Sequence, residues 1–391
     1  NFIGTTLSMN PKDILTNPTF CPMPWTGLMY NFDGKVKNCI RSVEELPIGN
    51  INNNSIQDIV AGQENVNRQH NIINKTPVSS CQTCYDIERG KQSVDIVSDR
   101  IFYIRELKQV PLTTYQSGNF DLKTVDVRWS NLCNFACVYC GPRFSSKWSS
   151  ELNVNLDTPT DAQVENFKQY IFDHAEKLKH VYLAGGEPLL MKQNLELLEL
   201  LLKVNPDVNL RINTNLSCVD TYIFETICKF KNVQWTVSAE TLEEEYEYIR
   251  YGGVWKDFVT NLATIRQLNH KITFNMLHFL LNYMSVFEFV DWATAQGFHP
   301  NSFVIGAMLE PDHLNIRHLP DATLKKVEQQ LQHRINQNPG YLLEDSYRNM
   351  LHYINTPANK NLQHSFDELA KLDQRRNLDS KKIFTSLYKE H

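Results

Sequence analysis

Cysteine is the residue type whose number and spacing point most directly to chemistry in this sequence. The chain has 391 residues and nine cysteines. Seven of the nine form two groups. The first group is Cys21, Cys39, Cys81 and Cys84, and the second is Cys133, Cys137 and Cys140. Secreted disulfide scaffolds are smaller and denser in cysteine, so we expect metal ligation in a reducing compartment.

The central group offers three thiolates at spacings of four and three residues, just past a predicted strand. Three thiolates at this spacing can wrap one small metal cluster. A [4Fe–4S] cluster takes four ligands, so one iron would keep an open position for a chelating substrate or cofactor. The spacing also fits a zinc knuckle, or a ferredoxin-like cluster whose fourth cysteine is distant in the sequence.

A glycine-rich turn follows the next predicted strand, with the sequence Gly185-Gly186-Glu187-Pro188. Two glycines let the backbone approach a ligand closely, and the glutamate adds an anionic acceptor. Such a turn suits an ammonium group. The same residues are also typical of a tight strand-to-helix turn with proline at the start of the helix.

Taken together, the three-cysteine loop and this turn resemble the radical S-adenosylmethionine (radical SAM) enzymes. The family signature has an aromatic residue before the third cysteine, here Tyr139. The resemblance implies a partial (β/α)6 barrel and a catalytic [4Fe–4S] cluster that chelates S-adenosylmethionine. The implied cluster ligands are Cys133, Cys137 and Cys140. The implied contacts of the cofactor's amino group are Gly185, Gly186 and Glu187, in the turn that Pro188 completes.

Four further residues match the family pattern in the expected order: Asn215, Ser238, Glu240 and Arg250. Asn215 follows the third predicted barrel strand. Ser238 and Glu240 are candidate contacts of the ribose or the methionyl carboxylate, although the family pattern has Asp where Glu240 stands. Arg250 is a candidate partner of the methionyl carboxylate. The alternative for Arg250 is a surface ion pair with the acidic run at 243–247.

The four N-terminal thiolates fit either structural zinc or a fully ligated [4Fe–4S] cluster. The surrounding sequence resembles the SPASM/twitch auxiliary-cluster domain that accompanies many radical SAM enzymes. The resemblance rests on Cys-Pro-Met-Pro-Trp at 21–25, the element from Gly34 to Cys39, Arg68, and the pair Cys81 and Cys84. It implies one auxiliary [4Fe–4S] cluster on Cys21, Cys39, Cys81 and Cys84. The sequence departs from most relatives because this segment precedes the barrel, and zinc remains the alternative.

Alternating strand and helix patterns from about residue 122 indicate an α/β fold with parallel strands. The predicted strands are 124–130, 179–184, 208–213, 232–238, 271–278 and 301–307, with helices including 191–203, 255–268 and 284–296. A hairpin is predicted at 28–32 and 35–40. The expected organisation is a metal-stapled twitch-like domain (1–95), a linker (96–121), a partial (β/α)6 TIM-like barrel (122–310) and a helical extension (311–391). The mixed charges of 371–382 are typical of a solvated helix.

Side-chain alternation predicts which strand residues face the barrel interior. Asp126 and Arg128 share one face of their strand, and Arg211 and Asn213 share one face of theirs. Asn275 likewise lies on the polar face of its predicted strand. Charges inside a barrel are costly unless they pair or meet a ligand. We expect these five residues to contact a polar, charged substrate, or else Asp126 pairs with an arginine in a supporting ion-pair layer.

Composition limits the classes of partner. The net charge of −5 argues against general nucleic-acid binding. The sequence contains no run of about 18 apolar residues, so it predicts no membrane span. The first residues, Asn1 to Gly4, lack the features of a secretory signal, so we expect a cytoplasmic protein.

These features predict an oxidoreductase-type radical SAM enzyme that forms a 5′-deoxyadenosyl radical and abstracts hydrogen from a polar substrate. The resemblance favours a peptide or protein side chain, with a sugar, nucleoside or nucleotide as the alternative. It also implies an electron donor such as flavodoxin or ferredoxin. A non-catalytic iron–sulfur or zinc protein is the alternative of another class. Cys218 and Cys228 stand apart and are expected to be core thiols.

Overall fold

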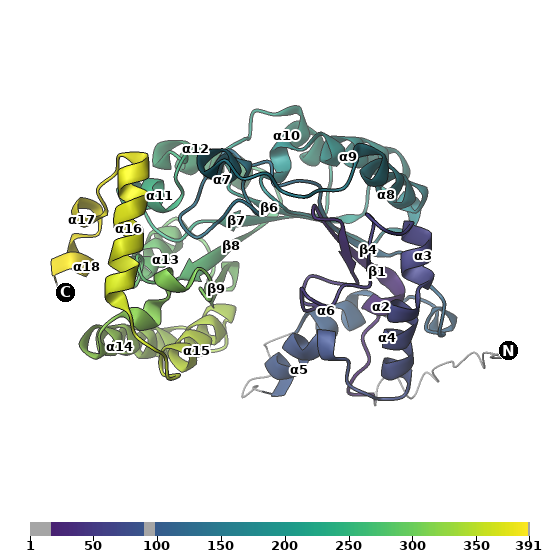
Figure 1. Ribbon diagram of the computed structural model, residues 1–391, viewed down its shortest axis with the longest axis horizontal. Coiled ribbons are helices and arrows are strands. Elements are labelled where there is room, and N and C mark those ends of the chain that lie inside the picture. Colours follow the sequence, from purple (N-terminus) through teal and green to yellow (C-terminus); the bar gives the residue numbers. More distant parts are fainter. Residues whose placement is uncertain (1–16, 90–97, 390–391) are drawn as a thin grey trace. The chain divides into compact units, whose positions relative to one another are not determined.

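The computed structural model describes residues 17–89 and 98–389 (Figure 1). The residues to which the expected lack of a secretory signal refers, 1–4, lie outside this part. The chain forms two compact units. The first unit consists of the chain up to residue 132 together with 155–212 and 220–233. The second unit consists of 133–154, 213–219 and the chain from 234 onward.

The first unit is built on a sheet whose strands follow the order β3-β2-β1-β4-β5-β6. The strands are β1 (Gly27–Asn31), β2 (Lys35–Lys37), β3 (Gly49–Asn50), β4 (Thr124–Arg128), β5 (His180–Leu183) and β6 (Asn209–Thr214). β1 and β2 form the predicted antiparallel hairpin, and β3 extends it. β4, β5 and β6 are parallel, as the alternating pattern predicts.

The N-terminal hairpin continues the sheet of the first predicted barrel strand. β1 pairs with β4 in parallel, with Gly27 opposite Thr124 and Asn31 opposite Arg128. Every residue of β1 is buried. The segment expected to be a linker also contributes to the N-terminal core, because Leu107, Val110 and Tyr115 pack against Phe20 and Trp25. The N-terminal region and the start of the barrel therefore share one sheet.

Local sequence explains where the helices of the first unit begin. The helices are α2 (Met23–Thr26), α3 (Ile56–Ala61), α4 (Gln63–Ile73), α5 (Gln82–Arg89), α6 (Asp99–Glu106), α8 (Asp161–Asp173), α9 (Lys192–Val204) and α10 (Tyr222–Ile227), with 3₁₀ turns at Ser79–Cys81, Leu112–Thr114, Ala175–Lys177 and Pro188–Leu190. The Ser55 hydroxyl accepts a hydrogen bond from the Asp58 backbone N–H and so starts α3. A reciprocal capping box of Thr160 and Gln163 starts α8.

The second unit carries the remaining parallel strands in the order β7-β8-β9. They are β7 (Val233–Ser238), β8 (Lys271–His278) and β9 (Phe303–Ala307). Its helices are α7 (Ser146–Leu152), α11 (Glu243–Ile249), α12 (Trp255–Arg266), α13 (Ser285–Ala295), α14 (Asp321–Gln337), α15 (Leu342–Ile354), α16 (Leu362–Arg376), α17 (Ser380–Ile383) and α18 (Thr385–Lys389), with 3₁₀ turns at Pro300–Ser302, Asp312–Leu314 and Ile316–His318.

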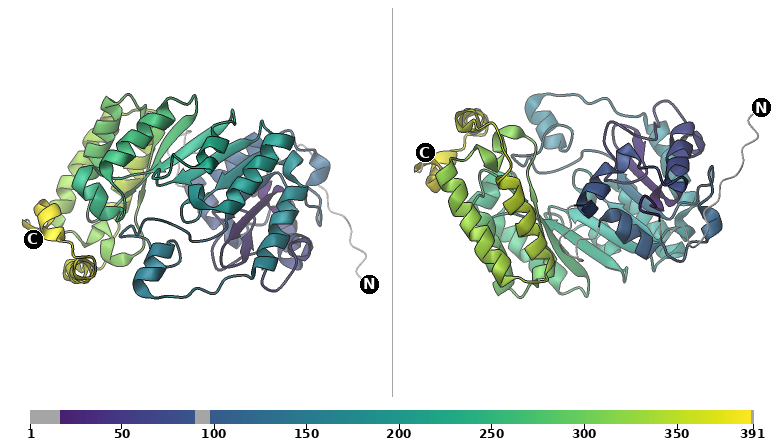
Figure 2. Two further views of the ribbon diagram at one scale, coloured as in Figure 1. Left: turned by 90° about the horizontal axis from the view of Figure 1, so that it is seen from above. Right: turned by 90° about the horizontal axis from the view of Figure 1, so that it is seen from below.

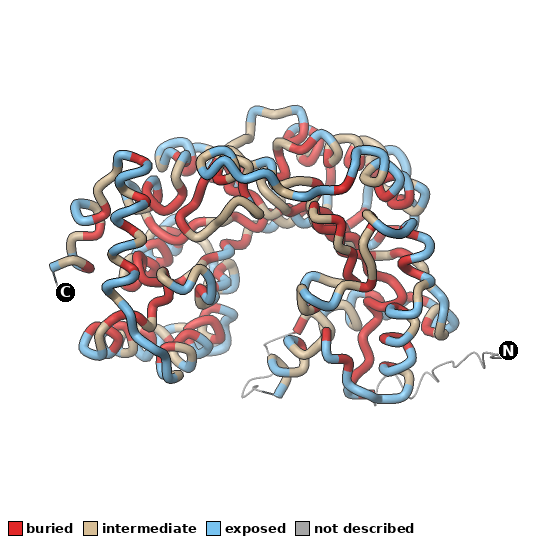
Figure 3. The backbone as a smooth tube through the Cα atoms, in the orientation of Figure 1, coloured by how far each residue is buried: buried red, intermediate tan, exposed pale blue. Residues whose placement is uncertain are grey.

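The apolar faces of the strands are buried, as the alternation predicts, and Thr124 and Asp126 on the other face of β4 are buried as well. Val125 and Val127 of β4 are fully buried, as are Trp235 and Val237 of β7. Figure 3 shows the buried residues following the strands and the inner faces of the helices within each unit. The chain is therefore an α/β protein in which successive parallel strands are joined by helical crossovers, the arrangement expected of a partial (β/α)6 barrel.

The C-terminal region is helical, as predicted. α14 and α15 lie side by side (Figure 2). α15 also covers β9, where the Ile305 backbone N–H donates to the Ser346 hydroxyl at 3.1 Å. Among the described residues, none of the helices has the length and apolar character that crossing a membrane requires.

Candidate functional site

The three-cysteine loop, residues 133–140, has no regular secondary structure and is held by hydrogen bonds to α7. The Ser145 hydroxyl caps α7 by accepting from Trp148 N–H at 3.2 Å, and it donates to the Phe135 carbonyl at 2.5 Å. The Ser146 hydroxyl accepts from the Cys133 N–H at 3.1 Å. The indole N–H of Trp148 donates to the Cys137 carbonyl at 2.8 Å. One short helix thus fixes the loop at three points.

A second set of contacts fixes the opposite side of the loop. The Ala136 N–H donates to the Tyr251 carbonyl and the Val138 N–H donates to the Ile249 carbonyl, both at 2.8 Å. Asn215, the residue predicted after the third strand, donates to the Asn134 side chain at 3.0 Å. Its amide nitrogen also lies 4.0 Å from Cys133 Sγ. Asn215 therefore positions the loop from its own side.

The predicted cofactor contacts Glu240 and Arg250 pair with each other. Arg250 donates from Nε and Nη2 to the two carboxylate oxygens of Glu240, at 2.8 and 2.5 Å. Both side chains are almost fully buried. The Tyr139 hydroxyl donates to Glu240 at 2.8 Å. The alternative of a surface ion pair at 243–247 is wrong, because the chain after α11 turns Arg250 inward rather than toward solvent.

Arg250 also places positive charge next to the central thiols. Its Nη1 lies 4.0 Å from Cys137 Sγ. A hydrogen bond between the Cys137 and Cys140 thiols lowers the pKa of Cys137 and raises that of Cys140. The charge of Cys133 also raises the pKa of Cys140. Three neighbouring thiols beside a buried guanidinium form a donor set that fits an anionic iron–sulfur cluster.

The Gly-Gly-Glu-Pro turn packs on the backbone of residues 130–132. Gly185 has φ +113, and a Cβ at Gly186 would lie 2.2 Å from the Leu132 carbonyl oxygen. The Glu187 N–H donates to that carbonyl at 2.7 Å. The Glu187 carboxylate is fully buried and accepts from the Leu189 N–H at 3.1 Å, at the start of the 3₁₀ turn that Pro188 opens. The turn thus has the strand-to-helix geometry expected, and both glycines are sterically required.

The predicted polar face of the first unit is a continuous row of side chains. Asp126 of β4 lies opposite Tyr182 of β5, which lies opposite Arg211 of β6. Arg128 pairs with Asp126 at 3.3 Å. The guanidinium groups of Arg128 and Arg211 lie 5.9 and 5.1 Å from the centre of the Tyr182 ring. Burial raises the pKa of Asp126 although Arg128 opposes this shift.

This row has features of both interpretations of the polar face, an internal ion pair and a surface for substrate contacts. The Asp126–Arg128 pair is the internal ion pair of the alternative, whereas Arg211 is exposed on the same face. Tyr182 was not among the predicted site residues, although the alternation of 179–184 places it on the polar face together with His180. The face is more exposed along β5 and β6 than at Asp126, so it can receive an anionic group between two guanidinium groups.

The remaining predicted polar residues lie in the second unit. Ser238 and Asn275 are opposite each other on β7 and β8, and Asn275 is exposed. The Asn213 side-chain oxygen is buried and has no hydrogen-bond partner among the described residues. His278, the last residue of β8, lies in the same unit and is buried. Its ring is hydrogen-bonded to the Tyr283 carbonyl, and burial lowers its pKa to about 4.

The four N-terminal thiols come from separate elements around one apolar core. Cys21 precedes α2, Cys39 follows β2, Cys81 ends a 3₁₀ turn, and Cys84 lies in α5. Cys21 belongs to the core, and Cys39 and Cys81 pack against it. Burial raises the pKa of Cys21, and the neighbouring Cys81, Cys39 and Cys84 raise it further. The four thiols are therefore close enough to interact electrostatically.

Arginines surround this group. Arg41 pairs with Asp99, Arg100 pairs with Glu88, and the buried Arg68 donates to the Leu46 carbonyl at 2.5 Å. The charge of Arg68 lowers the pKa of Cys81, and that of Arg41 lowers the pKa of Cys84, against the effect of burial. Within the described residues no three ligating side chains converge on a point that would hold a single metal ion. Buried thiols compensated by nearby cations fit an anionic cluster.

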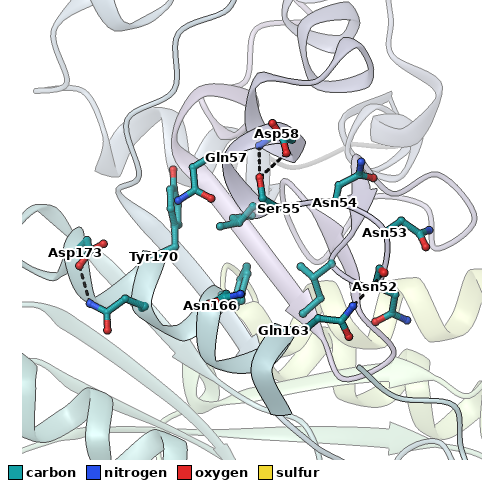
Figure 4. Close-up of a pocket in the computed structure, with 14 residues that line it drawn as sticks. Asn52, Asn53, Asn54, Ser55, Gln57, Asp58, Gln163, Asn166, Tyr170 and Asp173 are labelled. Atoms are coloured by element: carbon teal, nitrogen blue, oxygen red, sulfur yellow. Dashed lines mark hydrogen bonds between the residues drawn. The ribbon is translucent and has the colours of Figure 1, made fainter. Parts of the chain in front are cut away.

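A cavity of about 580 Å³ opens elsewhere in the first unit. It lies between residues 51–58 and α8, and Figure 4 shows Gln163, Asn166 and Tyr170 of α8 facing this segment. Its lining is rich in side-chain amides. None of the predicted site residues lines it.

Two parts of the chain match known families. Residues 127–293 match the radical SAM superfamily, and residues 21–85 match an iron–sulfur cluster-binding domain named SPASM. A curated relative, GTP 3′,8-cyclase from Campylobacter lari, is 24% identical over 160 residues, which cover 41% of this chain and 47% of the relative. The chain thus spans about half the length of the curated relative that it matches.

Similar solved structures include anSMEcpe with bound AdoMet, at 17% identity and a TM-score of 0.42, covering 55% of this chain and 60% of that chain. SuiB from Streptococcus suis bound to precursor peptide SuiA has 16% identity and a TM-score of 0.41, covering 69% of this chain and 62% of that chain. The family matches imply S-adenosylmethionine and iron–sulfur clusters, and the donor sets described above fit them. The chain therefore combines a radical SAM domain in residues 127–293 with an iron–sulfur cluster-binding domain of the SPASM family in residues 21–85.

Proposed function

We propose that this protein is a radical SAM enzyme that acts on a small anionic substrate of the nucleotide or sugar-phosphate class. When bound and reduced, the catalytic cluster and S-adenosylmethionine supply a 5′-deoxyadenosyl radical that abstracts a hydrogen from the substrate. Cys133, Cys137 and Cys140 hold this cluster. The observation that carries the substrate class is the pair of guanidinium groups of Arg128 and Arg211, which come from the strands that flank β5 and lie 5.9 and 5.1 Å from the centre of the Tyr182 ring.

The chain's own residues have distinct proposed roles around the cofactor. The turn at 185–187 receives the amino group of S-adenosylmethionine, and Ser238 and Asn275 offer polar contacts along β7 and β8. Arg250 balances the charge of the central thiolates, because it lies beside Cys137 and is held by Glu240. Cys21, Cys39, Cys81 and Cys84 hold the auxiliary cluster, whose ligands are then all supplied by protein.

This substrate class differs from the peptide or protein side chain that the family resemblance favours. An anionic substrate agrees with the arginine pair and with a relative named for its action on GTP. Two guanidinium groups beside an aromatic ring suit a phosphate group that carries a base or sugar.

The test is an anaerobic assay of 5′-deoxyadenosine formation with a chemical reductant. Reconstituted protein receives S-adenosylmethionine and one of a panel of nucleoside triphosphates, sugar phosphates and acidic peptides. We expect a phosphorylated compound to accelerate 5′-deoxyadenosine formation over the substrate-free rate, and Arg128→Met or Arg211→Met to raise its KM at least tenfold. Acceleration by peptides alone would overturn the substrate class.

A matched control separates substrate binding from support of the fold. Arg348 of α15 is exposed and pairs with Glu344 one turn earlier in the same helix, so Arg348→Met should leave KM unchanged. If Arg128→Met lowers the melting temperature and leaves KM unchanged, the polar face is an internal ion-pair layer and not a substrate site.

A further inference from the structure

The C-terminal helix α16 ends in a buried arginine that contacts the segment after the three-cysteine loop. The Arg376 side chain is only 1% exposed. Its Nε lies 3.2 Å from both carboxylate oxygens of Glu151 in α7. Its guanidinium carbon lies 4.3 Å from the ring centres of both Trp148 and Tyr251. The neighbouring Arg375 reaches the same carboxylate only at 3.4 Å and is more exposed.

The two residues whose rings contact Arg376 are both hydrogen-bonded to the three-cysteine loop, Trp148 through its ring N–H and Tyr251 through its backbone carbonyl. The Trp148 indole N–H donates to the Cys137 carbonyl at 2.8 Å. The Tyr251 carbonyl accepts from the Ala136 N–H at 2.8 Å. Ala136 and Cys137, which are adjacent in the loop, are therefore hydrogen-bonded to two residues whose rings contact the same guanidinium group.

This arrangement is specific to arginine. A planar guanidinium can stack on two ring faces and still point Nε at a carboxylate, whereas a lysine ammonium can do only one of these well. The Nη1 and Nη2 atoms of Arg376 are buried, and Nη2 lies 3.1 Å from a carboxylate oxygen of Glu151, so this carboxylate and the two rings together compensate the buried charge.

We propose that Arg376 is a positioning residue for the catalytic cluster. The C-terminal helix holds Trp148 and Tyr251 in fixed orientations, and these fix the backbone of Ala136 and Cys137 and thereby the direction of the Cys137 thiolate. This gives a role to a region beyond the radical SAM match, which ends at residue 293. The proposal rests on the proposed function only in taking Cys137 as a cluster ligand.

The test compares four single variants of the full chain: Arg376→Met, Arg376→Lys, Trp148→Phe and Arg375→Met. Trp148→Phe keeps a ring for the cation–π contact but removes the hydrogen bond to Cys137. Hydrogen exchange of a peptide covering 133–140 reports on the loop in the purified protein. EPR of reduced, reconstituted protein with and without S-adenosylmethionine reports on the cluster, because only the catalytic cluster responds to the cofactor.

We expect Arg376→Met and Trp148→Phe to accelerate loop exchange at least tenfold and to shift the cofactor-induced EPR difference spectrum. Arg376→Lys should recover part of both effects, and Arg375→Met should match the wild type. Wild-type exchange and spectra in Arg376→Met would overturn the proposal. So would equal acceleration in β8, because the arginine would then support the unit as a whole.

The two proposals fail in different ways. If wild-type protein gives no EPR response to S-adenosylmethionine, the proposed function fails. Hydrogen exchange at 133–140 would still decide whether α16 fixes the loop.

Discussion

The four N-terminal cysteines come from separate elements spread between Cys21 and Cys84, whereas the three central cysteines lie in one short loop. The N-terminal thiols are gathered by an apolar core in which Trp25 packs against Phe20 and Tyr115. The central thiols are instead held by hydrogen bonds from α7 and from the chain after α11.

This difference separates substitutions that destabilise a domain from substitutions that change the geometry of a cluster site in an intact fold. Ligands brought together by long-range packing exist as a site only when that packing has formed, so the N-terminal cluster and its domain should be stable or lost together. A local loop on a hydrogen-bonded frame can change its geometry while the fold stays intact. We therefore expect substitutions near the first site to act on stability and those near the second to act on cofactor chemistry.

The largest effect should come from replacing Cys133, Cys137 and Cys140 together with alanine. Without these ligands the catalytic cluster cannot assemble, so 5′-deoxyadenosine formation and the EPR response to S-adenosylmethionine should disappear. Iron content should fall from about eight to about four per chain, because the N-terminal site keeps its four thiolates. Cys228→Ala is the control and should retain both signals. Complete iron loss in the triple variant would show that the two sites are interdependent.

Trp25→Ala tests the dependence of the N-terminal site on its core. Trp25 is fully buried, and its indole N–H donates to the Gln116 carbonyl at 2.8 Å. Emptying this volume should cost about 4 kcal/mol of unfolding free energy and release the N-terminal iron. Denaturant unfolding and iron counting measure both. The exposed Tyr222 is the control, since Tyr222→Ala should change stability by less than about 0.5 kcal/mol.

Arg250→Met tests the buried charge beside the central loop. Removing Arg250 leaves the buried Glu240 carboxylate without its counter-ion, although the Tyr139 hydroxyl still donates to it, and should cost about 3 kcal/mol. Adding Glu240→Gln to the same chain should recover most of this stability, yet the double variant should keep an altered EPR spectrum because the charge near Cys137 is gone. If the double variant regains the wild-type spectrum, Arg250 acts only on the fold.

The smallest effect should come from Gly252→Ala. Gly252 has φ +105, and an added Cβ would lie 3.0 Å from the Asn134 carbonyl oxygen and 2.5 Å from Lys147 Nζ. Gly118 has φ +85 and open space around the same position. Both substitutions strain the backbone by about 1–3 kcal/mol, but only Gly252→Ala should disturb the three-cysteine loop. Equal EPR difference spectra in the two variants would contradict this expectation.

Sequence patterns predicted the parts of the fold that depend on local periodicity. The predicted strand 271–278 and the observed β8 have the same limits, and the other predicted barrel strands agree within about two residues. The polar face of β4 was also predictable, because alternation alone places Asp126 and Arg128 on one side. Tyr182 could have been found by the same argument applied to the next strand.

Pairings between distant segments were not predictable in this way. The tail at 371–382 has the mixed charges of a solvated helix, yet Arg376 is buried between two rings more than a hundred residues away in the sequence. Arg250 and Glu240 are both in the motif region, but nothing in their spacing shows that the turn after α11 directs one at the other. Tertiary packing determines these contacts, and a single sequence carries little signal for them.

The parallel pairing of β1 with β4 has a consequence for synthesis of the chain. A ribosome completes β1 and its hairpin well before it delivers β4, so the backbone N–H and C=O groups along the edge that β4 covers are unpaired in the nascent chain. Open strand edges invite association with other chains. A chaperone that shields residues 27–31 during this interval would improve the yield of the protein, and an expressed fragment starting at residue 122 would carry the complementary edge uncovered.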